Sequence, residues 1–205
     1  MQQILRDKSG SIIRKFEEEN DDFHVSASEN MTIKFWAVIK NSQLSFTFDA
    51  EHENTSIECY FLIPARDNQN VKLDIKTNFK SANTKVIINV IALASDKSSI
   101  TLNGNLHIQD WINKVEGRLY EETLLIWDAK YISMVPWLRV DSPDVIASHW
   151  AKIQRISPER IFYMQSRWLD SNKAIWMIIN SYTQNIIQKL QLNDQQQSEF
   201  YSMIK

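Results

Sequence analysis

The feature that most constrains the fold is a two-residue hydrophobic alternation between about residue 31 and residue 108. Apolar side chains recur at every second position there, with polar side chains between them. The clearest runs are 44–48, 57–63, 71–75, 86–90, 100–102 and 106–108. A side-chain period of two is typical of β-strands that bury one face. The sequence therefore predicts a mainly β chain, with Cys59 as a buried core thiol on one of these faces.

The spacing of these strands narrows the architecture further. Turn-like clusters of Asn, Asp, Ser and Lys separate the runs at 67–70, 81–83 and 96–99. Strand starts recur about every 12 to 15 residues, which fits a sandwich, a barrel or a β-solenoid. The alternation by itself does not choose among the three.

Both ends of the chain depart from this pattern. Residues 1–22 are polar and include an acidic run, which predicts a solvated N-terminal arm before a β core at 23–156. After Ile156, Ser157 is a good helix N-cap and Pro158 suits a first helical position. Apolar residues then recur every three or four positions up to Leu190, and a short third helix is expected after Asn193. We therefore expect a helical region at 157–205.

Composition excludes several classes of function. The net charge of −2 gives no support for nonspecific binding to nucleic acid, and the apolar runs are too short to span a membrane. The three glycines cannot form a phosphate-binding loop, so any nucleotide would have to be bound by a partner. The single cysteine permits no intramolecular disulfide and no multi-cysteine metal site. With no apolar leader at the start, these features predict a cytoplasmic protein.

Two short sequence phrases stand out in the segment 144–169. The first contains Asp144, Val145, Ser148 and His149, and the second contains Phe162, Tyr163, Ser166 and Arg167. Together they resemble the end of the β-helix in the SufB/SufD family of iron–sulfur cluster assembly. Gly104 and the segments 124–126 and 136–140 also resemble family strands. The resemblance covers roughly residues 50–190 and is closest to a reduced SufD-like member.

This resemblance implies both a fold and a role. The implied fold is a right-handed parallel β-helix, a β-solenoid, followed by a small C-terminal α-helical region. The implied role is that of a non-catalytic scaffold, which pairs through its β-helix with a SufB-like subunit or with a second copy of itself. A SufC-like ABC ATPase would dock on the C-terminal helices. A transient iron–sulfur cluster would form at the interface between the subunits.

The resemblance also points to interface residues. His149 would lie at the cluster-assembly interface, as an iron ligand or a proton carrier. Glu121 stands where SufB-like members have a cysteine, and Trp150 where they have a glutamate. Ala147 replaces the cysteine of SufD-like members. Simpler interpretations remain open, namely a hydrogen-bonded histidine near the sheet end and a solvated strand edge at Glu121.

The helical region supplies candidates for ATPase docking. These are Arg160, Phe162, Tyr163 and Arg167. Trp168 follows them at the position of a family glycine. The alternative is that the helices cap the end of the β-helix, and both roles are compatible.

A different class of function is also open. The chain contains seven tryptophans, and aromatic faces are common in carbohydrate-binding proteins. Polysaccharide-cleaving enzymes usually need a pair or cluster of carboxylates, and none is recognisable in the sequence. The alternative to a scaffold is therefore a β-rich carbohydrate-binding or structural interaction module without cluster chemistry.

Overall fold

The computed structural model describes residues 2–6, 10–126, 129–190, 194–195, 197–198 and 202. In this part of the chain, a long series of strands precedes two helices. The strands are β1 (Gln2–Arg6), β2 (Gly10–Glu17), β3 (Asn20–Ala27), β4 (Thr32–Lys40), β5 (Gln43–Ala50), β6 (Ser56–Ala65), β7 (Asn70–Phe79), β8 (Lys85–Ala94), β9 (Ser99–Ile108), β10 (Val115–Leu125), β11 (Tyr131–Val140) and β12 (Val145–Arg155). The helices are α1 (Pro158–Gln165) and α2 (Ser171–Leu190).

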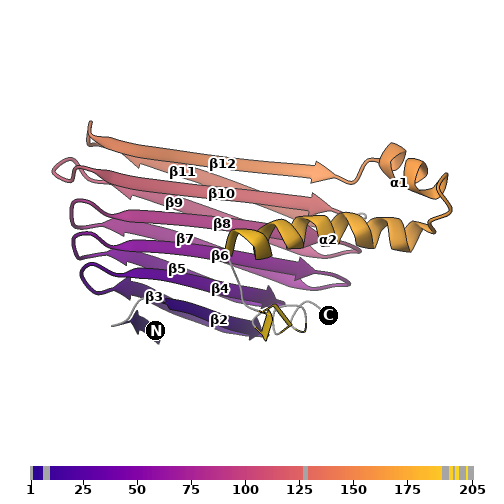
Figure 1. Cartoon of the computed structure of the whole chain (residues 1–205), viewed down its shortest axis with the longest axis horizontal. Coiled ribbons are helices and arrows are strands. Elements are labelled where there is room, and N and C mark those ends of the chain that lie inside the picture. The colour runs from indigo at the N-terminus through magenta and orange to yellow at the C-terminus, as the bar shows by residue number, and fades with distance from the viewer. Residues whose placement is uncertain are drawn as a thin grey trace.

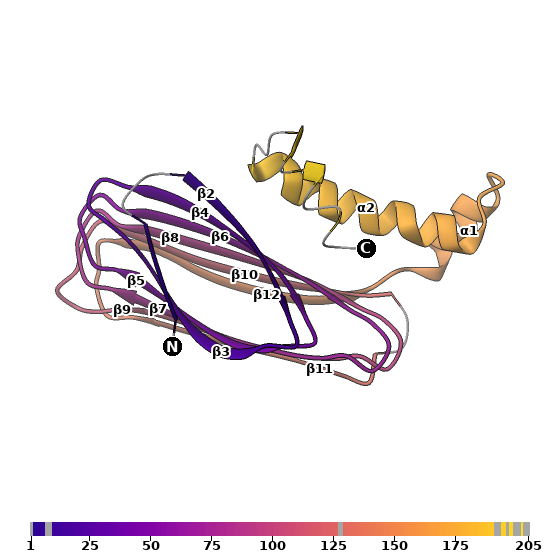
Figure 2. The ribbon, with the colours of Figure 1, turned by 90° about the horizontal axis from the view of Figure 1, so that it is seen from below.

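The strands form two parallel sheets that face each other. Sheet A has the order β1-β3-β5-β7-β9-β11, and sheet B has the order β12-β10-β8-β6-β4-β2. Each strand therefore pairs with the strand two places away along the chain, because the backbone crosses to the other sheet after every strand (Figures 1 and 2). This winding is a β-solenoid, which confirms the expected fold class and rules out the sandwich and the barrel.

The alternating side chains fill the space between the sheets. Inward residues on successive strands stack in rows, and almost all of them are aliphatic or aromatic. Phe46 has its ring centroid 5.0 Å from that of Phe23 on the neighbouring strand and 4.8 Å from that of Phe61 on the facing sheet. Cys59 has no exposed surface in this core, as predicted. Apolar burial of this kind contributes about 25 cal/mol per Å² and is the main stabilising term.

The corners of the solenoid use residues that tolerate the left-handed backbone conformation. Asn30, Asn54 and Asn83 have φ values of 59°, 57° and 55° in successive turns. Asparagine adopts this conformation more readily than other non-glycine residues because its short side chain bonds locally. The Asn54 amide also donates a 3.0 Å hydrogen bond to the Asn30 side chain. These corners let a chain with few glycines turn sharply between the sheets.

The expected solvated arm at residues 1–22 is wrong. Strands β1 and β2 and the start of β3 occupy this segment, and β2 pairs in parallel with β4. Phe16 on β2 is only 2 % exposed, and its ring centroid lies 5.0 Å from that of Phe23. Strand pairing and one buried aromatic residue outweigh the polar composition of the segment, because the acidic side chains can remain on the outer surface.

Helix α2 lies along the outer face of sheet B (Figures 1 and 2). Ile175, Ile178 and Ile179 pack on a second apolar cluster that includes Trp36 and Tyr60. The Gln154 amide on β12 also donates to the Tyr182 hydroxyl and, at 2.5 Å, to a Glu122 carboxylate oxygen. The helices therefore cover a sheet face, and the alternative in which they cap the end of the β-helix is wrong.

The start of α1 follows its sequence signals. The Ser157 hydroxyl accepts a 3.3 Å hydrogen bond from the Arg160 backbone N–H, and Pro158 is the first helical residue. Neither α1 nor α2, the helices of the described part, combines the length and apolarity needed to cross a bilayer. The third helix expected after Asn193 falls largely on residues outside the described ranges.

Candidate functional site

Strands β10 and β12 bring Glu121 and His149 together inside the last coil of the solenoid. The two strands are parallel neighbours, with Leu119 opposite His149 and Glu121 opposite Ala151. Both side chains point inward, so they meet diagonally across one pair of strands. His149 Nε2 lies 3.1 Å from Glu121 Oε2. The structure thus joins two residues that are 28 positions apart in the sequence.

This pair is buried but incompletely bonded. The side chains of His149 and Glu121 are 5 % and 0 % exposed. Their other polar atoms, His149 Nδ1 and Glu121 Oε1, have no hydrogen-bond partner among the described residues. A buried polar atom without a partner costs about 1–3 kcal/mol. The pair therefore destabilises the fold relative to an apolar core, and it leaves one nitrogen and one oxygen without hydrogen bonds inside the last coil.

The solvated strand edge suggested for Glu121 is wrong. The alternation on β10 directs Glu121 inward, and β12 and β8 flank it on both sides. The prediction that His149 is hydrogen-bonded near the sheet end is confirmed by its contact with Glu121. Any role as a ligand is a separate matter for function.

Trp150 does not join the pair. It follows His149 directly on β12, so its side chain points to the opposite face and is 44 % exposed. The Lys152 ammonium lies 5.9 Å from the centre of its ring. Trp150 therefore belongs to the outer surface beside the open edge of sheet B.

The chain does not assemble a complete metal-ligand set in its described part. No group of three or more His, Cys, Asp and Glu side chains is arranged there to hold a metal. Cys59 lies in the same inward row as His149, but three strands away across Ile88 and Leu119, which is roughly 14 Å. Burial raises the pKa of the Cys59 thiol well above its usual value, which disfavours the thiolate that binds metals.

The last coil also leaves apolar surface uncovered. Strands β11 and β12 are the outer strands of sheets A and B, and no described element lies beyond them (Figure 1). Exposed apolar side chains on these two strands are Tyr131, Val135, Trp137, Leu138, Val140, Ile146, Trp150 and Ile153. Unpaired strand edges with apolar side chains favour association with another chain.

A second exposed apolar surface lies on the helices. Phe162 on α1 is 72 % exposed, and Tyr163 is also exposed, with the Arg167 guanidinium 4.7 Å from the centre of its ring. Arg160 and Tyr163 line an open depression of about 450 Å³ between α1 and α2. All four residues suggested for docking therefore lie on the exposed surface of α1 and the turn after it.

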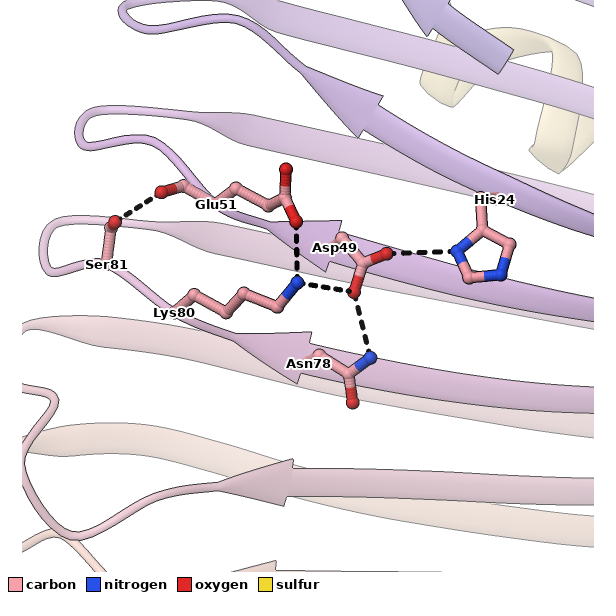
Figure 3. A network of polar contacts seen from close by, with 6 residues as sticks. All are labelled: His24, Asp49, Glu51, Asn78, Lys80 and Ser81. Atoms are coloured by element: carbon pink, nitrogen blue, oxygen red, sulfur yellow. Dashed lines mark hydrogen bonds and ion pairs between the residues drawn. The ribbon is translucent and has the colours of Figure 1, made fainter. Parts of the chain in front are cut away.

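A second polar cluster, on the outer face of sheet A, has a structural explanation. Asp49 accepts a 2.8 Å hydrogen bond from Asn78 and lies 3.1 Å from His24 Nδ1 (Figure 3). Lys80 bridges Asp49 and Glu51, with Nζ–O distances of 3.7 and 2.5 Å. These residues link β3, β5 and the end of β7 with mutually satisfied contacts, which is the role of a cross-strand ladder.

Comparison with known proteins gives a family match over most of the chain. The sequence model of the SufBD core domain, described as part of the SUF system of FeS cluster assembly, matches residues 22–182. The iron–sulfur cluster assembly protein SufD of Escherichia coli (strain K12) is 30 % identical over 98 residues, which cover 48 % of this chain and 23 % of SufD. A chloroplastic SufBD family protein of Arabidopsis thaliana is 21 % identical over 167 residues, which cover 80 % of this chain and 30 % of that protein. A SufBD family protein of Archaeoglobus fulgidus is 34 % identical over 76 residues, which cover 37 % of this chain and 21 % of that protein. In each of these three cases the chain spans less than a third of the relative's length.

Proposed function

The chain belongs to the SufB/SufD family of the SUF system, and from this premise we propose that it is a scaffold subunit in iron–sulfur cluster assembly. The observation that carries the proposal is the position of the His149–Glu121 pair. It is buried, incompletely bonded and placed in the last coil, beside apolar strand edges that nothing in the described part covers. A purely structural solenoid gains no stability from such a pair, so its presence there favours a role in chemistry at an interface.

The open end of the solenoid would pair with a homologous subunit. Edge strands β11 and β12 offer unpaired backbone groups, and the inward residues Leu138 and Ile153 are exposed at the end of the core. A second solenoid docked there would bury these side chains and bring its own residues close to His149. We propose a SufB-like chain or a second copy of this chain as the partner.

The cluster would be cargo at this interface. The His149 imidazole and the Glu121 carboxylate would offer one nitrogen and one oxygen ligand to incoming iron. Iron–sulfur clusters are normally held by cysteine thiolates, and the one cysteine of this chain is buried three strands away. The partner would therefore supply the thiolates, and the cluster would be held only transiently.

The helical surface would dock an ABC-type ATPase of the SufC kind. Exposed aromatic residues and arginines are enriched where proteins bind one another, and Phe162, Tyr163 and Arg167 form such a group. ATP hydrolysis would take place on that partner, so this chain would act as a non-catalytic scaffold. The expected cytoplasmic location stays a prediction.

The proposal is tested by co-expressing the chain with a SufC-like ATPase and a SufB-like protein from the same genome. Native mass spectrometry should find one complex that contains the ATPase and two scaffold chains. Phe162→Ser should release the ATPase, whereas Trp111→Ser should not, because Trp111 is equally exposed at 73 % but lies between β9 and β10. Val135→Lys on the edge strand β11 should separate the two scaffold chains.

Cluster chemistry needs its own measurement on the purified complex. His149→Ala should lower the iron and sulfide content after reconstitution, while the mass of the complex stays the same. Unchanged cluster content would remove His149 from the chemistry. A monomer that binds neither protein but binds glycans would replace the scaffold proposal with the carbohydrate-binding alternative.

A further inference from the structure

One inward position of sheet A breaks the apolar stack of the core. The inward residues of β9 are Ile100, Leu102, Gly104, Leu106 and Ile108. A glycine in a strand interior weakens the strand, because it has no side chain to pack and loses more backbone entropy on folding. Its backbone here does not need glycine, since no described glycine has a positive φ. The reason for Gly104 must therefore be space.

The space beside Gly104 is filled by Leu119 and by the His149–Glu121 pair. A Cβ atom added at Gly104 would lie 2.8 Å from Glu121 Oε1 and 3.1 Å from His149 Cε1. It would lie 2.4 Å from Leu119 Cδ2, which belongs to the residue opposite His149 on β10. All three groups would have to move. Glu121 Oε1 is also one of the two atoms of the pair without a hydrogen-bond partner in the described part.

We infer that Gly104 is a positioning residue for the His149–Glu121 pair, acting from the opposite sheet. Its missing side chain lets the carboxylate extend across the interior far enough to meet the imidazole, with Oε1 directed at the backbone of β9. Any side chain at position 104 would displace the carboxylate and alter the 3.1 Å contact between Nε2 and Oε2. Only the purpose of the positioned pair, cluster chemistry at an interface, rests on the proposed function. The effect of Gly104 on the position of the Glu121 carboxylate does not depend on that function.

The chain offers a matched control in Gly117. It lies inward on β10, and a Cβ atom there would be 3.0 Å from Phe79 Cζ and 3.1 Å from Leu106 Cδ2. Gly117→Ala therefore crowds the same core as Gly104→Ala but meets only apolar atoms. A general packing defect would appear in both variants, whereas a positioning effect would appear in one.

The test follows the ring nitrogens of His149 by ¹⁵N NMR in the full chain, with His149→Gln to assign the signals. Gly104→Ala should shift both ring ¹⁵N signals of His149, and Gly117→Ala should leave them unchanged. If the His149 signals are the same in Gly104→Ala and wild type, Gly104 does not position the pair. Because this readout needs no partner or cluster, it is independent of the proposed function. A shift in these signals without loss of cluster content in the complex would support the positioning by Gly104 and would remove the pair from the cluster chemistry.

A double-mutant cycle covers the case in which Gly104→Ala folds but is too unstable for the NMR measurement. Glu121→Ala removes the carboxylate that the new Cβ would meet at 2.8 Å, so in the double variant this contact is gone while the contact with Leu119 Cδ2 remains. Gly104→Ala should raise the unfolding equilibrium constant at least fivefold less in the Glu121→Ala background than in wild type. Equal effects in the two backgrounds would show that Gly104 and the carboxylate do not interact, and would overturn the inference.

Discussion

His149 and Glu121 are in contact although they are not opposite each other in the sheet. The residue opposite His149 on β10 is Leu119, two positions before Glu121, so the 3.1 Å contact between Nε2 and Oε2 is diagonal. Diagonal neighbours on adjacent strands are within reach of long side chains. The carboxylate bridges this offset within an apolar interior, where each atom of the pair that lacks a partner is costly.

Removing one member of the pair should destabilise the fold more than removing both. His149→Leu leaves a buried carboxylate without a partner, which costs about 3–5 kcal/mol. The double variant Glu121→Leu/His149→Leu should be at least as stable as wild type, since an apolar pair leaves no polar atom unsatisfied. Urea denaturation of the two single variants and the double variant measures this coupling. Additive single effects would show that the two side chains are not coupled.

Cys59 should be unreactive in the folded protein. It has no exposed surface, and burial raises the pKa of its thiol, so both access and the reactive thiolate are suppressed. Iodoacetamide should modify it only in step with global unfolding. Rapid labelling without denaturant would show that the Cys59 thiol is accessible in the folded protein and could bind a cluster.

Tyr60 should make stability depend on alkaline pH. Burial, followed by the nearby Glu58, raises the pKa of its phenol to about 12 in the folded protein, against about 10 in the unfolded chain. Its contribution is therefore fully present below about pH 10 and is lost as the pH rises through about 12. The loss is at most about 2.7 kcal/mol, from two pKa units at about 1.36 kcal/mol each.

The matched variant for this effect is Tyr60→Phe. It keeps the stacking on Trp36, where the ring centroids lie 5.2 Å apart, but removes the titrating group. The difference in unfolding free energy between Tyr60→Phe and wild type should grow in favour of the variant between pH 10 and 12. A difference that stays constant with pH would place the phenol in solvent.

Asp49 should matter more than Glu51, although both contact Lys80. Asp49 is 7 % exposed and bonds His24 and Asn78 from neighbouring strands (Figure 3). Asp49→Ala should lower the unfolding free energy by about 2 kcal/mol, because it breaks several charge-assisted bonds at once. Glu51→Ala removes a carboxylate that is 42 % exposed and should cost under about 1 kcal/mol. Thermal or urea unfolding of both variants compares them directly, and equal losses would refute the ladder.

Trp168 should lower the stability of the turn after α1, while its exposed side chain is available for binding a partner. It has a φ of 68° and is 98 % exposed, at a turn position where glycine is favoured. Trp168→Gly should stabilise the turn between α1 and α2 by about 0.5–1 kcal/mol, because it relieves the left-handed backbone strain. If this side chain contributes to ATPase docking, the same variant should weaken that binding in a titration of the complex. A variant that is less stable than wild type would show that Trp168 packs against its own chain.

Much of the fold could be predicted from the sequence because strand alternation is a local property. The positions of Phe46, Phe61 and Leu73 in the core follow directly from their period of two. The prediction for residues 1–22 came from polar composition instead and was wrong, because β4, Phe23 and Phe46 bury Phe16. Polar composition indicates that side chains are exposed to solvent. It does not indicate whether the backbone that carries them is hydrogen-bonded in a sheet.

The candidate site divides in the same way. Local sequence predicts His149 on a strand and Phe162 on the first helix, and both residues belong to the two phrases that resemble the SufB/SufD family. Only the tertiary structure decided that Glu121 is buried, that it bonds His149 and that Gly104 makes room for both. Contacts between positions 28 and 45 residues apart depend on the register of neighbouring strands and on the facing sheet. The strand register and the arrangement of the two sheets face to face are set by how the whole core packs. The location of strands and of helix caps is set by the few residues that form them.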